Sequence, residues 1–189
     1  MKKLLSLAVA LAAVVAVAYA AELKSGLQSG DAIGAFDVTK VAGATDDGVE
    51  VGKTLCYRCK YGSRPMVMVF TRQTDEKMAD LIKQLDSAVA KNSDTQLRAF
   101  VNVLGDDRAD AEKAAEQLAS ATKPANVPVV VPVEFKNGPD NYGINPQADV
   151  TIILATDGKV TGNHTFEKGL SCESCVESIM TDVSKLTSK

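Results

Sequence analysis

The stretch Pro65-Met66-Val67-Met68-Val69-Phe70 decides the fold of this chain. The five residues after the proline are all apolar, a pattern typical of a strand that is covered on both faces in the centre of a sheet. Residues 99–104 predict a second buried strand of the same kind. Because the residues between them have the pattern of an amphipathic helix, the three segments predict an α/β fold. The apolar residues of that helix recur at helical spacing: Met78, Leu81, Ile82, Leu85 and Val89.

Further elements extend this unit on both sides. Before it, residues 35–41 and 48–55 predict a short hairpin whose turn contains Asp47-Gly48. After it, residues 127–135 are β-branched but contain two prolines, which cannot donate to a ladder, so we expect an edge strand or an irregular segment. The other expected elements are a helix opened by Asp106 and Asp107 and running to about residue 121, a hairpin of strands 150–155 and 159–166, and a helix over 174–186.

The first twenty residues have the pattern of a signal peptide. Lys2 and Lys3 precede an apolar run that ends in Ala18-Tyr19-Ala20, a small-x-small cleavage site, so we expect cleavage after Ala20 and export to the periplasm or the cell exterior. The mature chain, residues 21–189, is expected to form a single domain. Of the 21 Lys and Arg, removal of two leaves 19 against 24 Asp and Glu, which gives a net charge near −5.

Composition excludes several classes of protein. A hydrophobic fraction of 46% is too high for a disordered chain, and a net charge of −3 gives no electrostatic reason to expect a nucleic-acid partner. The single His excludes sites that need two or more imidazoles. After the leader, no stretch is long and apolar enough to predict a membrane span.

Four short motifs, in order along the chain, carry a resemblance to a known family. They are Gly30-Asp31 followed by Phe36, the Asp47-Gly48 turn, Tyr142-Gly143-Ile144 and Asp157-Gly158-Lys159. With the element order, they resemble the thioredoxin-like superfamily, in particular its peroxiredoxin branch of alkyl hydroperoxide reductases and thiol-specific antioxidants. The resemblance implies a three-layer α/β/α fold with a central mixed sheet and an N-terminal β-hairpin extension.

The chain departs from that family where the reactive Cys usually lies. This Cys follows the first core strand, but residues 71–77 contain none. Asp149-Val150-Thr151 also stands where the family has a proline before its antiparallel strand. A conventional peroxiredoxin peroxidase is therefore not expected.

All four cysteines lie in two Cys-x-x-Cys pairs, Cys56 with Cys59 and Cys172 with Cys175. This spacing allows a small disulfide ring or two thiolate ligands to one zinc ion, and spacing alone does not choose. The resemblance implies that the first pair lies at the N-terminal end of the first core strand and the second pair at the opposite end of the sheet. One zinc bound by all four thiolates is therefore the less favoured alternative.

The two pairs differ in their charged neighbours. Arg58 and Lys60 are expected to stabilise a thiolate in the first pair and so to lower its pKa, whereas Glu173 and Glu177 act in the opposite sense on the second. Ser174 and Glu177 also have the spacing of a capping box for the last helix.

The sequence supports three hypotheses of different kinds. The first is thiol-disulfide exchange through Cys56 and Cys59 without a cofactor, with a protein redox partner or an exported protein as substrate. In this hypothesis Cys172 and Cys175 are a second redox pair or a structural one. The second is a non-catalytic binding module stapled by two disulfides. The third is a zinc-binding protein; His164 is better explained as a surface residue than as a fourth ligand.

Overall fold

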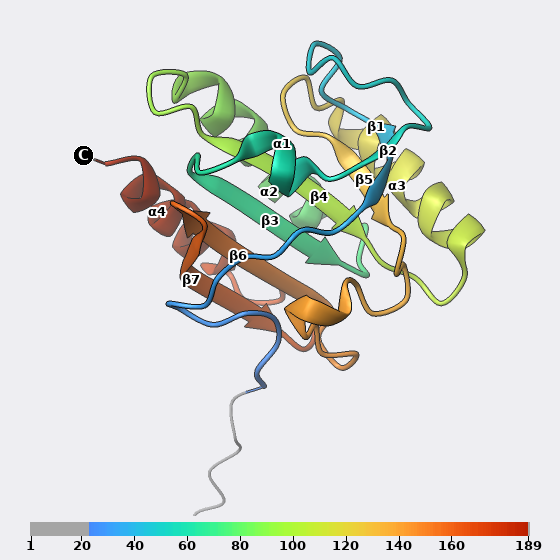
Figure 1. Ribbon diagram of the computed structural model, residues 1–189. Helices are drawn as coiled ribbons and strands as arrows, with labels where there is room; N and C mark the ends of the chain where they lie inside the picture. Colours follow the sequence, from blue (N-terminus) through green and yellow to red (C-terminus); the bar gives the residue numbers. More distant parts are fainter. Residues whose placement is uncertain (1–22, 189) are drawn as a thin grey trace, which may run out of the picture.

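The computed structural model describes residues 23–188, and the predicted signal peptide over residues 1–20 lies outside them (Figure 1). Seven strands form one mixed sheet in the order β2-β1-β5-β4-β3-β6-β7. The elements in chain order are β1 (Val38–Ala42), β2 (Thr54–Leu55), α1 (Tyr57–Tyr61), β3 (Met66–Thr71), α2 (Glu76–Lys91), β4 (Arg98–Val103), α3 (Arg108–Thr122), β5 (Val129–Pro132), the 3-10 helix η1 (Asp140–Tyr142), β6 (Val150–Thr156), β7 (Lys159–Phe166) and α4 (Cys175–Thr187).

Strand β3 is the interior strand that its unbroken apolar run predicts. It pairs in parallel with β4 and antiparallel with β6, and all six of its residues are buried. The connection from β3 to β4 is α2, which begins at the N-cap Asp75 and ends at Asn92. The predicted hairpin at Asp157-Gly158 joins β6 to β7, and both turn residues have positive φ. The α/β prediction is therefore confirmed, with β3 at its centre.

The prediction for residues 127–135 is wrong. Strand β5 lies inside the sheet, between β4, to which it is parallel, and β1, to which it is antiparallel. The two prolines lie just before the strand and at its last residue, so its interior keeps its N–H donors. Pro128 still contributes its carbonyl oxygen, which accepts the N–H of Val101. Prolines at both ends therefore leave this short strand able to pair on both sides.

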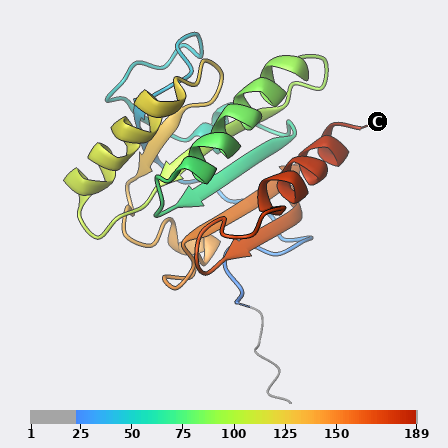
Figure 2. The same ribbon diagram turned by 180° about the vertical axis from the view of Figure 1, so that it is seen from behind.

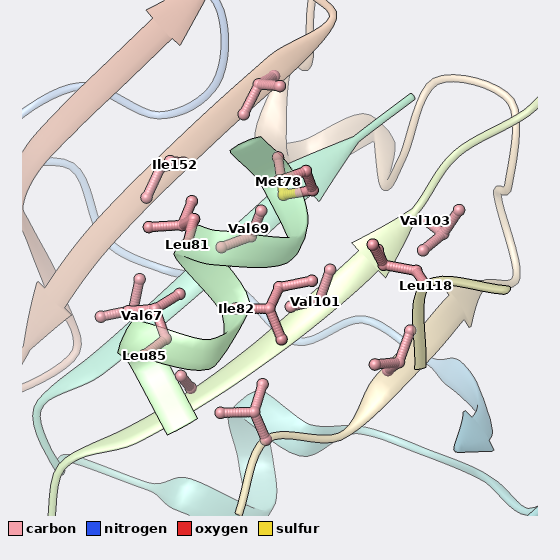
Figure 3. Close-up of a cluster of buried hydrophobic side chains, with 14 of the residues drawn as sticks. Val67, Val69, Met78, Leu81, Ile82, Leu85, Val101, Val103, Leu118 and Ile152 are labelled. Carbon is pink, nitrogen blue, oxygen red and sulfur yellow. The ribbon is translucent and has the colours of Figure 1, made fainter. Parts of the chain in front are cut away.

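The helices α2, α3 and α4 all lie on one face of the sheet (Figure 2). Alternate residues of the strands, such as Val67 and Val69 of β3, point into this layer and pack with Leu81 and Leu85 of α2 (Figure 3). All of these side chains are fully buried. This apolar layer fixes the three helices and supplies most of the core.

The opposite face is covered by one short helix, α1, together with η1 and extended chain (Figure 1). Its core is rich in aromatic rings. Phe36 packs against Phe70, Phe100 and Tyr142, with ring centroids 4.9 to 5.9 Å apart. The third layer of the α/β/α fold is therefore present but thin, and α1 is its main helix.

Residues 25–32 run along the outer edge of β7. The N–H of Gly30 donates to the Val160 carbonyl at 2.8 Å, and the Val160 N–H donates to the Asp31 carbonyl at 2.9 Å. The Asn163 side chain donates to the carbonyls of Ser25 and Leu27. The segment therefore occupies edge groups that β7 does not use for pairing with β6.

The N-terminal hairpin is present but shorter than predicted. Strand β2 has only two residues, since the chain over 48–53 forms an irregular segment with a turn at residues 51 and 52 instead of a strand. Within residues 23–188, no helix has the length and apolar character that a bilayer crossing needs.

Candidate functional site

The first cysteine pair lies on α1, a helix of five residues that the sequence pattern does not predict. Cys56 is the N-cap of this helix, and it forms a disulfide with Cys59 at a Cα–Cα separation of 5.2 Å. The backbone N–H of Cys59 donates to Sγ of Cys56 at 3.0 Å. Cys56 is half-buried and Cys59 is exposed. A thiolate at Cys56 would retain this N–H as a donor.

Two tyrosines hold α1 against the sheet. Tyr57 and Tyr61 are one helical turn apart, both are buried, and both pack on Phe100 of β4. The Tyr57 hydroxyl donates to Oδ2 of Asp47 at 2.6 Å. Burial, followed by the neighbouring Asp47 carboxylate, raises the pKa of Tyr57, which keeps the phenol protonated as this donor. The cysteines therefore lie on a helix that its two tyrosines hold against the sheet.

Asp47 belongs to a buried network that continues to Lys40 of β1. The Lys40 side chain is 2% exposed, and its Nζ lies 2.7 Å from Oδ1 of Asp47. The same nitrogen donates to the carbonyls of Ala44 and Val49. Burial alone would raise the pKa of Asp47, but hydrogen bonds from Lys40, Tyr57 and the Val49 N–H outweigh it and hold that pKa below its ordinary value of 3.8. The network therefore joins α1 to the loop after β1 and to the sheet.

The basic residues of α1 form no ion pair with any carboxylate in the part of the chain that the structure describes. Arg58 is half-buried and reaches toward the turn at Gly158, and its Nε is buried without a hydrogen-bond partner. Lys60 is exposed next to Cys59. The first turn of α1 holds no acidic residue. Free cations beside a thiol favour its thiolate form and lower its pKa.

The second pair lies where the chain enters α4. Cys172 and Cys175 form a disulfide; Cys172 is exposed, whereas Cys175 is the first residue of α4 and is buried in the helical layer. Lys77 of α2 donates from Nζ to the carbonyls of Ser171 and Cys172 at 3.1 and 3.3 Å. The predicted capping box is not formed, because the N-cap Ser174 makes no side-chain hydrogen bond to the helix.

The C-terminal end of β3, where the family that the motifs resemble has its reactive Cys, holds polar side chains and no thiol. Gln73 donates from Nε2 to Oδ2 of Asp149 at 2.7 Å, and its N–H donates to Thr71 Oγ1. The second disulfide lies beside this region, since Lys77 in the first turn of α2 contacts it. Residues 71–77 contain no Cys, and this position holds the Gln73 amide hydrogen-bonded to the Asp149 carboxylate.

The two disulfides lie at opposite ends of β3. The first pair lies on α1, which is followed by the N-terminal end of β3. The second pair lies next to the N-terminus of α2, and α2 follows the C-terminal end of β3. Six residues of strand span about 20 Å. The four sulfurs are thus not brought together as a shared zinc site requires, and residues 23–188 contain no group of three or more Cys, His, Asp or Glu with metal-binding geometry. His164 instead lies 3.0 Å from Asp182.

Solved structures with the same architecture come from the thioredoxin-like proteins. The provisionally assigned thiol:disulfide interchange protein DsbE of Chlorobium tepidum has a TM-score of 0.60 at 16% identity, covering 86% of this chain and 99% of that one. Mycobacterium tuberculosis AhpC has a TM-score of 0.60 at 12% identity, with 86% and 99% covered. The thioredoxin domain of a thiol-disulfide oxidoreductase from Bacteroides vulgatus has a TM-score of 0.54 at 14% identity, with 83% and 99% covered.

These likenesses define the class of fold. The chain has a thioredoxin-like fold with an N-terminal hairpin, as the motif resemblance implies. No protein-family model and no curated protein sequence match it. Activity has to be argued from the site, because one fold can carry many functions.

Proposed function

We propose that this protein exchanges thiols and disulfides through Cys56 and Cys59. The observation that carries the proposal is the hydrogen bond from the Cys59 N–H to Sγ of Cys56 at the start of α1. A donor aimed at this sulfur stabilises a thiolate, which is the nucleophile of exchange. The unpaired cations Arg58 and Lys60 act in the same direction.

The reaction runs through one mixed disulfide. In the reduced protein, the Cys56 thiolate attacks one sulfur of a partner disulfide, and the partner's first thiolate leaves and takes up a proton. The Cys59 thiolate then attacks the sulfur of Cys56, and the partner's second sulfur leaves as a thiol. The Cys56–Cys59 disulfide forms, two electrons pass to the partner, and both cysteine protons end on the partner's thiols. No cofactor takes part in these steps.

The second disulfide has a structural role in this proposal. Its Cys175 is buried in the core and begins α4, and the neighbouring Glu173 and Glu177 disfavour a thiolate. The Lys77 hydrogen bonds to the preceding carbonyls hold the same segment against α2. The pair therefore anchors the start of α4.

The proposal includes export of the protein to an oxidising compartment. The pattern of residues 1–20 supports a signal peptide, and an oxidising compartment would keep both pairs as disulfides. An exported protein or a small disulfide would then be the partner.

The test follows mixed-disulfide formation in single-cysteine variants. Reduced Cys59→Ser protein is expected to accumulate a covalent adduct on Cys56 when it is treated with hydroxyethyl disulfide, because the resolving thiol is missing. Cys56→Ser protein is expected to react at least tenfold more slowly. Intact mass spectrometry after acid quenching gives both rates.

The double variant Cys172→Ser/Cys175→Ser is the matched control, and its exchange rate is expected to equal that of the unchanged protein. Loss of exchange in this control, together with normal exchange in Cys56→Ser, would show that the second pair carries the reaction. If neither pair reacts faster than free cysteine, the protein is not an exchange catalyst.

A further inference from the structure

A pocket of about 510 Å³ opens beside α1, between the loop after β1, the C-terminal part of α2 and the start of β4. Lys60 and Tyr61 of α1 line one side, and Arg64, which follows α1, and Arg98 of β4 also line it. Val89 of α2 contributes an apolar patch. The volume lies within the range of about 300–1,000 Å³ that is typical of small-molecule sites. The pocket thus begins at the residue that follows Cys59.

The charge of this pocket is unbalanced. Lys60, Arg64 and Arg98 all line it, and none of them has a carboxylate partner within residues 23–188. Of the two acidic residues in its wall, Asp47 is already paired with Lys40, and Asp46 is exposed. The pocket therefore carries a net positive charge that the protein itself does not neutralise.

The two arginines are partly held in place but keep free donors. Arg64 donates from Nε to the Gln96 side chain at 2.6 Å and from one terminal nitrogen to the carbonyls of Lys60 and Tyr61. Arg98 donates from one terminal nitrogen to the Leu97 carbonyl at 3.0 Å. Both arginines are half-buried. Each retains at least one terminal nitrogen for a ligand, and a fixed guanidinium suits carboxylate geometry.

We propose that this pocket binds the carboxylate groups of a low-molecular-weight thiol or disulfide that exchanges with Cys56. The inference rests on the proposed function and names its substrate class. Cys56 and Lys60 lie one helical turn apart on α1, so a ligand whose carboxylate contacts Lys60 and Arg98 can place its sulfur next to the cysteine pair. The volume of about 510 Å³ suits a small molecule better than the flat contact of a protein partner.

The net charge of the protein predicts the opposite substrate preference to that of the pocket. The predicted mature chain is acidic, with a net charge near −5, so its overall field repels anions and favours cationic disulfides. A preference for an anionic disulfide must therefore come from a local group of cations. Screening by salt should reduce that preference.

The test compares three disulfides of similar length as oxidants of the reduced protein: 3,3′-dithiodipropionate with two carboxylates, neutral hydroxyethyl disulfide, and cationic cystamine. At low salt, dithiodipropionate is expected to react about tenfold faster than the neutral compound, relative to their rates with free cysteine. The Arg64→Gln/Arg98→Gln variant is expected to lose this advantage, which is measured as the ratio of its rates with dithiodipropionate and hydroxyethyl disulfide, so that a change in thiol reactivity common to both disulfides cancels. Lys168→Gln, which removes an exposed cation outside the pocket, is the control and is expected to behave like the unchanged protein.

A binding measurement keeps the two proposals separate. The disulfide form is titrated with 3,3′-thiodipropionate, a thioether that cannot exchange, and the side-chain N–H signals of Arg64 and Arg98 are followed by NMR. Saturable shifts that Arg98→Gln abolishes are expected. Exchange without any anionic preference would overturn the pocket and leave the proposed function standing. If no shifts are seen, the proposal that the pocket binds carboxylates is wrong, whatever the exchange rates are. If none of the three disulfides reacts, the proposed function is wrong.

Discussion

Asp47 links the helix that carries the first cysteine pair to the rest of the fold. It accepts hydrogen bonds from Lys40, Tyr57 and the Val49 N–H, and so joins a strand, a loop and α1 through one carboxylate. The sequence pattern indicates Asp47 only as part of a turn. The signal that could have found its role is the pair Tyr57 and Tyr61, four residues apart, because buried phenols need a partner.

Replacing Asp47 by Asn is expected to lower the free energy of unfolding by about 3–5 kcal/mol, because it leaves the Lys40 ammonium buried without its counter-ion. Urea denaturation measures the change. Tyr57→Phe is the milder control, with an expected loss of about 1–3 kcal/mol for one hydrogen bond to a charged acceptor. A loss of less than about 1 kcal/mol in Asp47→Asn, the size of an ordinary hydrogen bond, would show that the network does not hold the loop to α1.

The same carboxylate gives the protein an acid-sensitive stability. Its pKa is lowered in the folded protein from an ordinary value of 3.8. The contribution of Asp47 to stability is therefore complete above about pH 4 and is lost as the pH falls through the folded pKa. We expect the stability difference between the unchanged protein and Asp47→Asn to be constant from about pH 7 to 5 and to shrink below pH 3.8. Urea midpoints measured at each pH test this, and a difference that shrinks already above about pH 5 would point to another group.

At the scale of elements, periodicity predicts the long helices and misses the short helix α1. The sequence pattern predicts α2 together with its buried face, since sixteen residues give several turns of pattern. Helix α1, with five residues, gives one turn and no periodic signal. The sequence predicts an edge position for β5 because prolines inside a strand break its pairing. In the structure the prolines lie at the two ends of the strand, and the sequence pattern does not show where those ends are.

The second disulfide is expected to act on the element it precedes. The double change Cys172→Ser/Cys175→Ser should reduce stability by about 2 kcal/mol or less, because the closed loop is short, and should loosen the first turn of α4. Hydrogen exchange of the N–H groups of residues 176–180 checks the location of the effect. Faster exchange throughout α2 as well would mean that the pair supports the helical layer as a whole.

At the scale of the molecule, the motif resemblance predicted the fold, whereas the candidate site required the structure. The order of strands and helices depends on apolar patterns that are local in sequence. The basic pocket joins residues far apart in the chain, such as Lys60 with Arg98, and no spacing rule brings them together. The placement of the two cysteine pairs at opposite ends of the sheet was expected from the resemblance, and the structure confirms it.

Export is a prediction that is tested on the whole chain. Expression with the native leader in a bacterium is expected to give a periplasmic or secreted protein that begins at Ala21. N-terminal sequencing and intact mass identify the start. A product that retains Met1 and stays with the cells would contradict the signal-peptide prediction. Replacing Ala18 and Ala20 by Gln, which blocks a small-x-small site, is the control and should leave the leader attached.

The segment along β7 determines how far this chain can be shortened. A version that starts at residue 34 would lack the groups that Gly30, Asp31 and Ser25 offer to Val160 and Asn163. The N–H and C=O of Val160 on the outer edge of β7 would then be unpaired, and unpaired edge groups are a template for strand addition. The opposite edge of the sheet, β2, has only two residues and offers little of this kind. Removal of residues 23–33 would therefore expose more of this sheet edge to pairing with other chains.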